Sequence, residues 1–553
     1  MSDPGTEQRA IGQSPVTGTR PPGYPLRVIS AQAAAASGAL TGRAGEAAGF
    51  RTRWALLMSV AGGLALYASF PPLGIWPLAV LGPALLVLAL TGRSLRGSFG
   101  CALVFGLAQF VPLLSWLINL AWYAWAALAG SEAVIFALLA IGQRLLLRLP
   151  YWPVAVAGWW VLVEGVRDRW PYAFPWGRLA MSQSVAPDVR WVAFGGAPLL
   201  SFLIALTGAM LAGAVLAWLG PEGRARWTAS AAAVVTAGLV LAGGLLPADP
   251  TGGAPTAQVA AIQGNVPRAR NLPQQLSATQ VTQNHVDATL KLAAQVKAGQ
   301  RPAPDLVIWP ENATDLDPFQ NPSVYAQLSR AVAAIGKPIL VGEVLNDPRR
   351  NVGQLWAPGR GPTTAYVKRQ LVPFGEYIPF RGIISSFSDL PALQPIDFTA
   401  GRRPVVFGVG KIRLGDVICY EVAFDHLVRS EVTAGANLLT VQSNDADFEI
   451  DGQLGETKQQ TAMARIRAVE MDRAVVYAST TGESSIIAPD GSLIAHSGVW
   501  QQAILDARVP LVSYRTLASR VGAWPEYVII MLTVLALAWA IVRVTRQRRQ
   551  ASV

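Results

Sequence analysis

The chain has 553 residues, a formal net charge of +11 and a mean hydropathy of +0.35. Hydrophobic residues make up 52% and charged residues only 14%, whereas soluble chains carry about 25% charged residues. These values exclude an ordinary soluble protein, and two cysteines exclude a disulfide framework. The basic residues form no single patch along the chain, so the positive charge does not indicate a nucleic-acid partner.

The first fifty residues differ from everything that follows. Residues 1–50 are rich in Gly, Pro, Ala, Ser and Thr and lack apolar periodicity, which predicts a disordered cytoplasmic tail. They do not form a signal peptide, because the first apolar run begins only at Trp54.

Seven apolar runs then follow one another, and an eighth lies near the end. A membrane span needs about 20 mainly apolar residues, with ~17 at the short end. A single short run could equally be a buried core helix, but seven in succession favour a membrane bundle. We therefore predict eight spans, of which the second and fifth are marginal in length: Trp54–Phe70, Ile75–Leu90, Phe99–Ile118, Ala121–Ile141, Trp152–Val166, Trp191–Leu219, Trp227–Leu246 and Tyr527–Val542.

Arginines between the runs give the bundle an orientation. They precede the first run, separate the second and third, and follow the fourth, sixth and eighth, whereas the short turns on the other side carry none. By the positive-inside rule, both termini are cytoplasmic. This predicts seven spans within residues 51–247, an extracytoplasmic domain at 248–522, the eighth span at 523–543 and a basic cytoplasmic tail at 544–553.

The predicted extracytoplasmic segment is more polar and contains clusters of β-branched residues. Six of these clusters are typical of short buried strands, among them PDLVIWPE, KPILVGEV and ANLLTVQSND. Helical stretches such as Gln280–Lys297 and Glu456–Asp472 alternate with some of them. The pattern predicts a compact α/β domain between the seventh and eighth spans.

Three strand-end motifs in this domain carry chemistry-bearing side chains. VIWPENA contains Glu311, AYVKRQLVPFGEYIPF contains Lys368 and Glu376, and LGDVICYEVAF contains Cys419. In α/β sheets, functional groups gather at the carboxyl ends of strands. A thiolate nucleophile, a carboxylate base and an ammonium that stabilises an oxyanion form a workable acyl-transfer set. Taken singly, each has a structural alternative: a buried apolar cysteine, a helix cap, a solvated strand end or an arginine partner.

Other catalytic classes lack their signatures. The three histidines, His285, His426 and His496, match no Cys-His protease pattern. No paired cysteines or HExxH spacing indicate zinc, and no GxxxxGK[ST] or strand-linked GxGxxG indicates a nucleotide. We therefore expect neither a metal nor a cofactor.

The WPE motif, the lysine before LVPFGEYIP and the ICYE strand end together resemble the nitrilase superfamily. That resemblance implies an αββα sandwich in which Glu311 is the general base, Lys368 stabilises the oxyanion and Cys419 is the nucleophile. A nitrilase-like domain inserted before the last of eight spans resembles, more narrowly, the apolipoprotein N-acyltransferases. The resemblance extends from about Trp54 to Val542.

The same resemblance implies further site residues. Glu376 matches an additional active-site glutamate, and Tyr420 and Glu421 follow the cysteine as they do in the family. The chain also departs from the family pattern. Asp447 stands where a tryptophan is common, Gln459–Gln460 replaces a Gln-His pair, and TTGES replaces a TNxG-like turn.

The resemblance implies a two-step reaction. Cys419 would take an acyl chain from a membrane phospholipid as a thioester, and the α-amino group of a lipoprotein's lipidated N-terminal cysteine would then accept it, in the final step of lipoprotein maturation. The implied partners are a phospholipid donor and a diacylglyceryl apolipoprotein acceptor. We expect a monomer in the bacterial plasma membrane with its catalytic domain on the extracytoplasmic face.

The external loop 167–190 breaks the charge pattern because it contains four arginines. We hypothesise that Arg167, Arg169 or Arg178 contacts lipid phosphate, while the aromatic side chains of Trp170, Phe174 and Trp176 lie at the membrane interface. The alternative is an ordinary loop that anchors the domain.

Two other functions stay open. A membrane-tethered amidase or nitrile hydrolase would pass the acyl group to water, and a catalytically silent scaffold would bind lipoproteins without chemistry. Hydrolysis or transfer of the thioester discriminates the first, and the activity of a Cys419→Ala variant discriminates the second.

Overall fold

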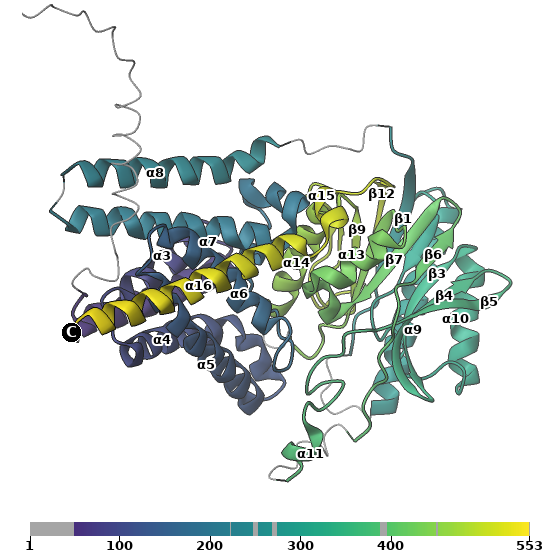
Figure 1. Cartoon of the computed structure of the whole chain (residues 1–553). Coiled ribbons are helices and arrows are strands. Elements are labelled where there is room, and N and C mark those ends of the chain that lie inside the picture. Colours follow the sequence, from purple (N-terminus) through teal and green to yellow (C-terminus); the bar gives the residue numbers. More distant parts are fainter. Residues whose placement is uncertain are drawn as a thin grey trace, which may run out of the picture.

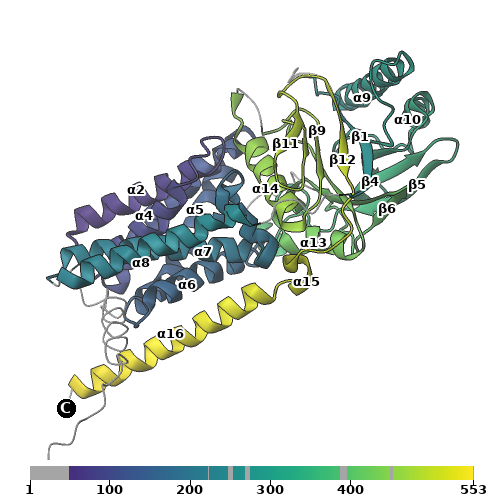
Figure 2. The ribbon, with the colours of Figure 1, turned by 90° about the horizontal axis from the view of Figure 1, so that it is seen from above.

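The computed structural model describes residues 49–221, 223–246, 253–267, 274–386, 395–448 and 452–551. The predicted cytoplasmic tail, residues 1–50, lies almost entirely outside this range. A helical part and a two-sheet domain lie end to end, and the last long helix runs back along the helical part (Figure 1). The view from above shows the same division (Figure 2).

A helix lies at each of the eight predicted spans: α2 (Thr52–Ser69), α3 (Leu78–Leu90), α4 (Leu95–Leu113), α5 (Trp122–Leu146), α6 (Trp152–Arg167), α7 (Val192–Leu219), α8 (Gly223–Leu241) and α16 (Trp524–Ala551). Within the described ranges, five segments are long and apolar enough to cross a membrane: Leu95–Leu113, Trp122–Leu146, Pro187–Leu219, Gly223–Leu245 and Trp524–Gln547. Helix α3 is apolar but has only 13 residues, and α2 and α6 fall outside the five. The short 3-10 segments η1 (Ser115–Asn119), η2 (Leu179–Gln183), η3 (Pro187–Trp191) and η4 (Ala242–Leu245) connect these helices.

Helix α7 is broken near its start. Gly195 and Gly196 have non-helical backbone angles, and the φ of +72° at Gly196 lies in the left-handed region that favours glycine. Pro198 follows and cannot donate a helical hydrogen bond. A Cβ at Gly196 would lie 3.0 Å from the Glu470 Oε1 atom, so the break allows a helix of the second domain to come close.

The second domain contains two six-stranded sheets. The first has the order β12-β1-β2-β3-β4-β5, and the second has the order β11-β10-β9-β8-β7-β6. In each sheet three central strands are parallel and the outer pairings are antiparallel. The strands are β1 (Thr256–Gln263), β2 (Leu306–Ile308), β3 (Ile339–Asn346), β4 (Arg349–Ala357), β5 (Gly361–Val367), β6 (Val406–Val409), β7 (Ile412–Ile418), β8 (Leu438–Ser443), β9 (Val475–Ser479), β10 (Ser485–Ile487), β11 (Leu493–His496) and β12 (Ala503–Pro510).

Helices cover both outer faces of the paired sheets, which confirms the predicted αββα arrangement. Helices α9 (Gln274–Lys297) and α10 (Pro322–Ile335) pack on the first sheet through one apolar cluster. A second cluster fills the space between the sheets. Helices α13 (Asp425–Thr433) and α14 (Gly455–Met471) cover the second sheet. The short helix α11 (Arg381–Ile384) projects from the second domain, and α15 (Leu517–Val521) lies at the junction with the helical part, just before α16.

The helical part and the second domain share one hydrophobic core. The cluster that contains Val441 of β8 and Met463 of α14 continues to Phe105 of α4 and Leu200 of α7. Burial of apolar surface is the main favourable term in folding, at about 25 cal/mol per Å². Helices α13 and α14 are therefore packed between a sheet on one side and the helical part on the other.

Candidate active site

Cys419 lies on a sharp turn at the carboxyl end of β7. It is the first residue of the 3-10 segment η5 (Cys419–Ala423) and has a φ of +53°. A non-glycine residue in this left-handed region is uncommon, and such backbone strain concentrates at functional sites. Cys419 as a whole residue is only 8% exposed, so the nucleophile lies in a nearly enclosed site.

Glu311 and Lys368 meet at the same edge of the sandwich. Glu311 follows β2 and Lys368 follows β5 directly, and Lys368 Nζ donates to Glu311 Oε1 at 2.9 Å. The second carboxylate oxygen of Glu311 accepts from the Asn444 backbone N–H at 3.0 Å. Both side chains are at most 6% exposed. The structure thus brings these two strand-end groups together.

Glu376 is a second carboxylate partner of the lysine. Lys368 Nζ donates to Glu376 Oε1 at 3.0 Å, and the Asn351 side-chain amide donates to both Glu311 Oε1 and Glu376 Oε1, at 2.6 and 3.1 Å. The Val372 backbone N–H holds the other oxygen of Glu376 at 2.8 Å. One ammonium and one amide thus bridge two carboxylates.

Burial and charge set the protonation states of this group. Burial raises the pKa of the Cys419 thiol well above its usual range, and the Glu311 carboxylate raises it further, while Lys368 opposes both. Burial also raises the pKa of Glu311. Burial acts to lower the pKa of Lys368, but Glu311 and Glu376 outweigh it and raise that pKa well above its usual value. These shifts favour a neutral thiol and a charged ammonium, and the raised pKa of Glu311 makes its carboxylate a stronger base.

Gln460 of α14 lies against the nucleophile, with its Nε2 atom 3.4 Å from Cys419 Sγ. The same amide nitrogen donates to Glu456, and the amide oxygen accepts from the Ser443 hydroxyl at 3.2 Å. The departure from the family at this position is thus in contact with the reacting sulfur. Its neighbour Gln459 instead accepts from Trp176 Nε1 at 2.6 Å.

The two residues after the cysteine have different surroundings. Glu421 is fully buried and accepts four hydrogen bonds, from the backbone N–H groups of Ile418, Arg369 and Gln370 and from the Tyr366 hydroxyl, at 2.7 to 3.0 Å. Glu421 therefore fixes the turn on which Cys419 lies. The Tyr420 ring faces the helical part and stacks on Trp176, with ring centroids 6.2 Å apart.

The arginine-rich loop is mostly turned inward. Arg167 pairs with Glu132 and donates to the Trp176 carbonyl oxygen at 2.6 Å, and Arg178 pairs with Asp425 at 3.1 Å. Trp176 itself is 2% exposed. These contacts favour a structural role for Arg167 and Arg178, because buried charges with protein partners are not free for phosphate, and Trp176 is too buried to face lipid.

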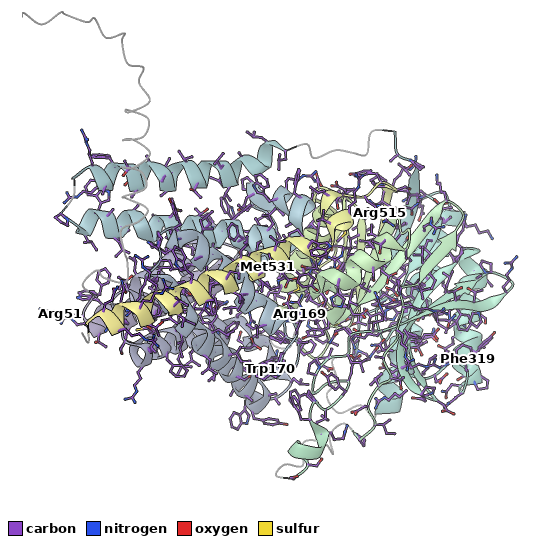
Figure 3. The ribbon with its side chains drawn as sticks, in the orientation of Figure 1. Arg51, Arg169, Trp170, Phe319, Arg515 and Met531 are labelled. Atoms are coloured by element: carbon purple, nitrogen blue, oxygen red, sulfur yellow. The ribbon has the colours of Figure 1, made fainter. Side chains whose placement is uncertain are left out.

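Arg169 differs from its neighbours. Its side chain is 49% exposed, although it pairs with Glu526 of α16 at 2.7 Å. Arg169 and Trp170 lie where the helical part meets the second domain, whereas Arg51 lies at the opposite end of the helical part (Figure 3). Lipid contact at this loop stays a prediction, now centred on Arg169.

Two residues of the site, Asn351 and Asn444, were missed in the sequence analysis. Asn351, in the middle of the carboxylate pair, belongs to no motif and reaches the site through the pairing of β4 with β3. The Asn444 N–H, which holds Glu311, belongs to the SNDADF block that indicated a shared motif without a role. In the part of the chain that the structure describes, no group of three or more His, Cys, Asp or Glu side chains could hold a metal ion.

The two sheets, the covering helices and the cysteine turn define a nitrilase-like domain joined to a helical part. Residues 258–519 match the carbon-nitrogen hydrolase family model, and residues 62–210 match the model of the apolipoprotein N-acyltransferase N-terminal domain. The chain belongs to the apolipoprotein N-acyltransferase family, and it is an acyltransferase.

Relatives of that name match along most of their length. An apolipoprotein N-acyltransferase of Mycolicibacterium smegmatis is 36% identical over 518 residues, which cover 88% of this chain and 85% of the relative. One of Azotobacter vinelandii is 31% identical and is covered to 96%. Among solved structures, an amidase of the nitrilase superfamily from Nesterenkonia sp. AN1 matches 48% of this chain at 17% identity, with a TM-score of 0.34.

Proposed function

We propose that the chain transfers an acyl chain from a membrane phospholipid, through a thioester on Cys419, to the α-amino group of the lipidated N-terminal cysteine of apolipoproteins. The observation that carries this proposal is the buried Glu311–Lys368 pair beside a strained cysteine turn that packs on the helical part. The names of the full-length relatives support the apolipoprotein acceptor.

In the first step the thiol attacks the donor ester. Glu311 takes the Cys419 proton, the sulfur bonds to the ester carbonyl carbon, and Lys368 stabilises the negative charge that develops on the carbonyl oxygen. The tetrahedral intermediate then breaks its C–O bond. The lysophospholipid alkoxide leaves with the proton that Glu311 held, and a thioester remains.

In the second step the acceptor of the acyl group is an amine. The neutral α-amino nitrogen of the lipoprotein attacks the thioester carbon and gives a proton to Glu311. When the C–S bond breaks, the thiolate takes a proton back and an amide remains. The enzyme returns to its starting state without a cofactor, so the residues present account for every proton.

Exposed apolar surface supports the proposed placement in a membrane. Helices α8 and α16 expose large apolar side chains, such as Val234 at 71% and Leu535 at 59%, which water would not tolerate in such numbers. We place all eight helices across a bacterial plasma membrane, with both termini cytoplasmic, the catalytic domain outside and the enzyme monomeric. Since pulling an acyl chain into water costs roughly 0.8 kcal/mol per CH₂, a thiol at the membrane surface suits two lipid-anchored substrates.

A second contact with lipid is proposed at Arg169. Arg169 borders a cavity of about 360 Å³ that lies between the ends of α6 and α16, the break in α7 and helix α13. Arg429 also lines it, and its positive charge acts to lower the pKa of Asp425 and of Glu470. The cavity further contains the carboxylates of Asp168, Asp425, Glu470 and Glu526, so a headgroup carrying both a phosphate and an ammonium fits its charges.

The test is the intact mass of the purified protein after incubation with one defined phospholipid. We expect one added acyl group, absent in Cys419→Ser and retained in Cys101→Ser, which replaces the other buried free cysteine as a matched control. A diacylated lipopeptide should discharge the acyl group. Loss to water at the same rate without the peptide would identify a hydrolase, and no adduct in any lipid would favour a silent scaffold.

A further inference from the structure

Three acceptor oxygens are buried together between the sheets without a donor. Asp416 lies on β7, three residues before Cys419, and Gln442 lies on the neighbouring strand β8. Both side chains are fully buried. Neither oxygen of Asp416 nor the Gln442 Oε1 atom has a hydrogen-bond partner within the described part of the chain. An ionised carboxylate in such a place would be very costly, because buried charges need partners.

The oxygens are close neighbours. Gly353 of β4 faces them from the other sheet, and a Cβ at that position would collide with Asp416 Oδ2 and lie only 2.6 Å from Gln442 Oε1. Two acceptors crowded around one point repel each other. A single proton on Asp416 converts this repulsion into an O–H···O hydrogen bond and satisfies two of the three oxygens.

The surroundings of Asp416 favour the protonated form. Burial raises its pKa well above the usual range, and the carboxylates of Glu421 on η5, Glu431 on α13 and Glu311 after β2 raise it further. The Val417 backbone N–H offsets part of this effect, but it does not reach either oxygen with hydrogen-bond geometry. From β4 and β8 the acid faces Gly353 and Gln442, which do not titrate.

The other end of the Gln442 amide reaches the chain segment that leads to the catalytic base. Gln442 Nε2 crosses between the sheets and donates to the Trp309 carbonyl oxygen at 2.6 Å, two residues before Glu311. If Gln442 turned its oxygen toward that carbonyl, two acceptors would face each other. A donor on Oε1 therefore fixes which way the amide points.

We propose that Asp416 is a positioning residue: a neutral carboxylic acid that donates to Gln442 Oε1 and, through Gln442 and Trp309, holds Glu311 opposite Cys419. The proposal rests on the role given above to Glu311 as the base. It links the strand that carries the nucleophile to the strand that carries the base.

Stability against pH tests the protonation state. An acid whose pKa is raised on folding binds more protons folded than unfolded, so stability falls as pH rises above the unfolded pKa of about 3.8, by up to tenfold in the unfolding equilibrium constant per pH unit. Asp416→Asn keeps a neutral donor and removes this penalty. We expect its unfolding temperature in detergent to exceed that of the unchanged protein at pH 8, with the difference shrinking toward pH 4.

A matched control is Asp287→Asn on the exposed face of α9, which should show no such trend. In infrared spectra, Asp416→Asn should also lose a protonated-carboxyl C=O band that Asp287→Asn keeps. A destabilised Asp416→Asn whose deficit is largest at neutral pH would mean an ionised Asp416, and it would overturn the proposal.

The rate of thioester formation tests the positioning role. Asp416→Ala and Gln442→Leu should each slow acylation of Cys419 at least about tenfold, since misplacing a reacting group by about 1 Å costs on the order of 10²-fold. Asp416→Asn should stay within about threefold of the unchanged protein. An Asp416→Ala variant that is less stable but acylates at the normal rate would reduce Asp416 to a structural role. Failure of the unchanged protein to form a thioester would instead defeat the proposed function, and the stability test would be unaffected.

Discussion

The Tyr420 hydroxyl donates a hydrogen bond to the Ala173 carbonyl oxygen at 2.6 Å. This contact joins the residue after the nucleophile to the loop that follows α6. The Tyr420 ring also stacks on Phe174 and Trp176 of that loop, with centroids 6.2 Å apart. The cysteine turn is thus seated directly on the helical part.

Tyr420 variants should separate the hydroxyl from the ring. Tyr420→Phe keeps the stacking and loses one hydrogen bond, worth about 0.5–1.5 kcal/mol, so we expect a small fall in unfolding temperature and near-normal acylation. Tyr420→Ala removes the ring and should slow thioester formation strongly. The growth of the acylated mass with time gives the acylation rate of both variants. If Tyr420→Ala were acylated as fast as the unchanged protein, the packing of Tyr420 on the helical part would not matter for catalysis.

Glu311 and Glu376 share Lys368, but their substitution should have unequal effects. Glu311→Gln removes the proposed base and should slow thioester formation by about 10²–10⁴-fold. Glu376→Gln leaves the base in place and weakens only one of two contacts to Lys368, so we expect a loss of about tenfold. The acylation rate of Cys419, measured at one fixed pH, compares the two variants. If both variants were slowed equally, Glu376 would also take part in the proton transfer.

Substitution of Glu421 should affect the stability of the fold more than the chemical step. Glu421→Ala leaves four donors without an acceptor, two of them buried and two partly buried, and each unsatisfied buried group costs about 1–3 kcal/mol. We therefore expect little folded protein and a much lower unfolding temperature, with Glu421→Gln in between. A well-folded Glu421→Ala protein that cannot form the thioester would instead point to a direct catalytic role.

Sequence patterns predicted the parts of the site that follow from strand ends. Glu311, Lys368 and Cys419 each come directly after or near an apolar strand, and the αββα fold brings those ends together. Asn351 could not be found this way, because its place depends on how β4 pairs with β3 rather than on any motif. Gln460 was visible only as a departure, since its contact with Cys419 depends on the orientation of α14.

The helical part was predicted with similar limits. A helix lies at every predicted span, because apolar length is a local property. The loop arginines were harder, since the partners Glu132 and Glu526 come from helices far away in the sequence. The break in α7 had a local signal in Gly195, Gly196 and Pro198, within what was predicted as one continuous span.

Glu343 predicts a pH dependence of stability away from the site. It is fully buried, accepts from Trp356 Nε1 at 2.6 Å, and burial raises its pKa to about 8. Between an unfolded pKa of about 4.5 and 8, the folded chain binds more protons, so stability falls as pH rises through this window. Glu343→Gln should raise the unfolding temperature at pH 8 and lose this advantage near pH 4.5. A gain that does not change with pH would contradict the assignment.

The proposed lipid contact in the cavity lined by Arg169 and Arg429 can be tested by substituting Arg429. Arg429→Glu should slow acylation from a phospholipid at low donor concentration, because it removes the proposed phosphate partner, and the effect should fade at saturation. Arg330→Glu, an exposed arginine on α10, is the matched control. If the acylation rate of Arg429→Glu depended on phospholipid concentration as in the unchanged protein, the proposal that lipid binds in this cavity would be wrong.

The antiparallel pairing of β1 with β12 has a consequence for biosynthesis. These two strands, hydrogen-bonded along Thr256–Gln263 and Ala503–Pro510, are the first and last of the second domain. As the ribosome makes the chain from its N-terminus, β1 emerges early and must wait for nearly the whole domain before its partner exists. The first sheet can therefore close only when α16 is about to be synthesised. An active thiol thus appears late, after helices α2 to α8 of the helical part have been made.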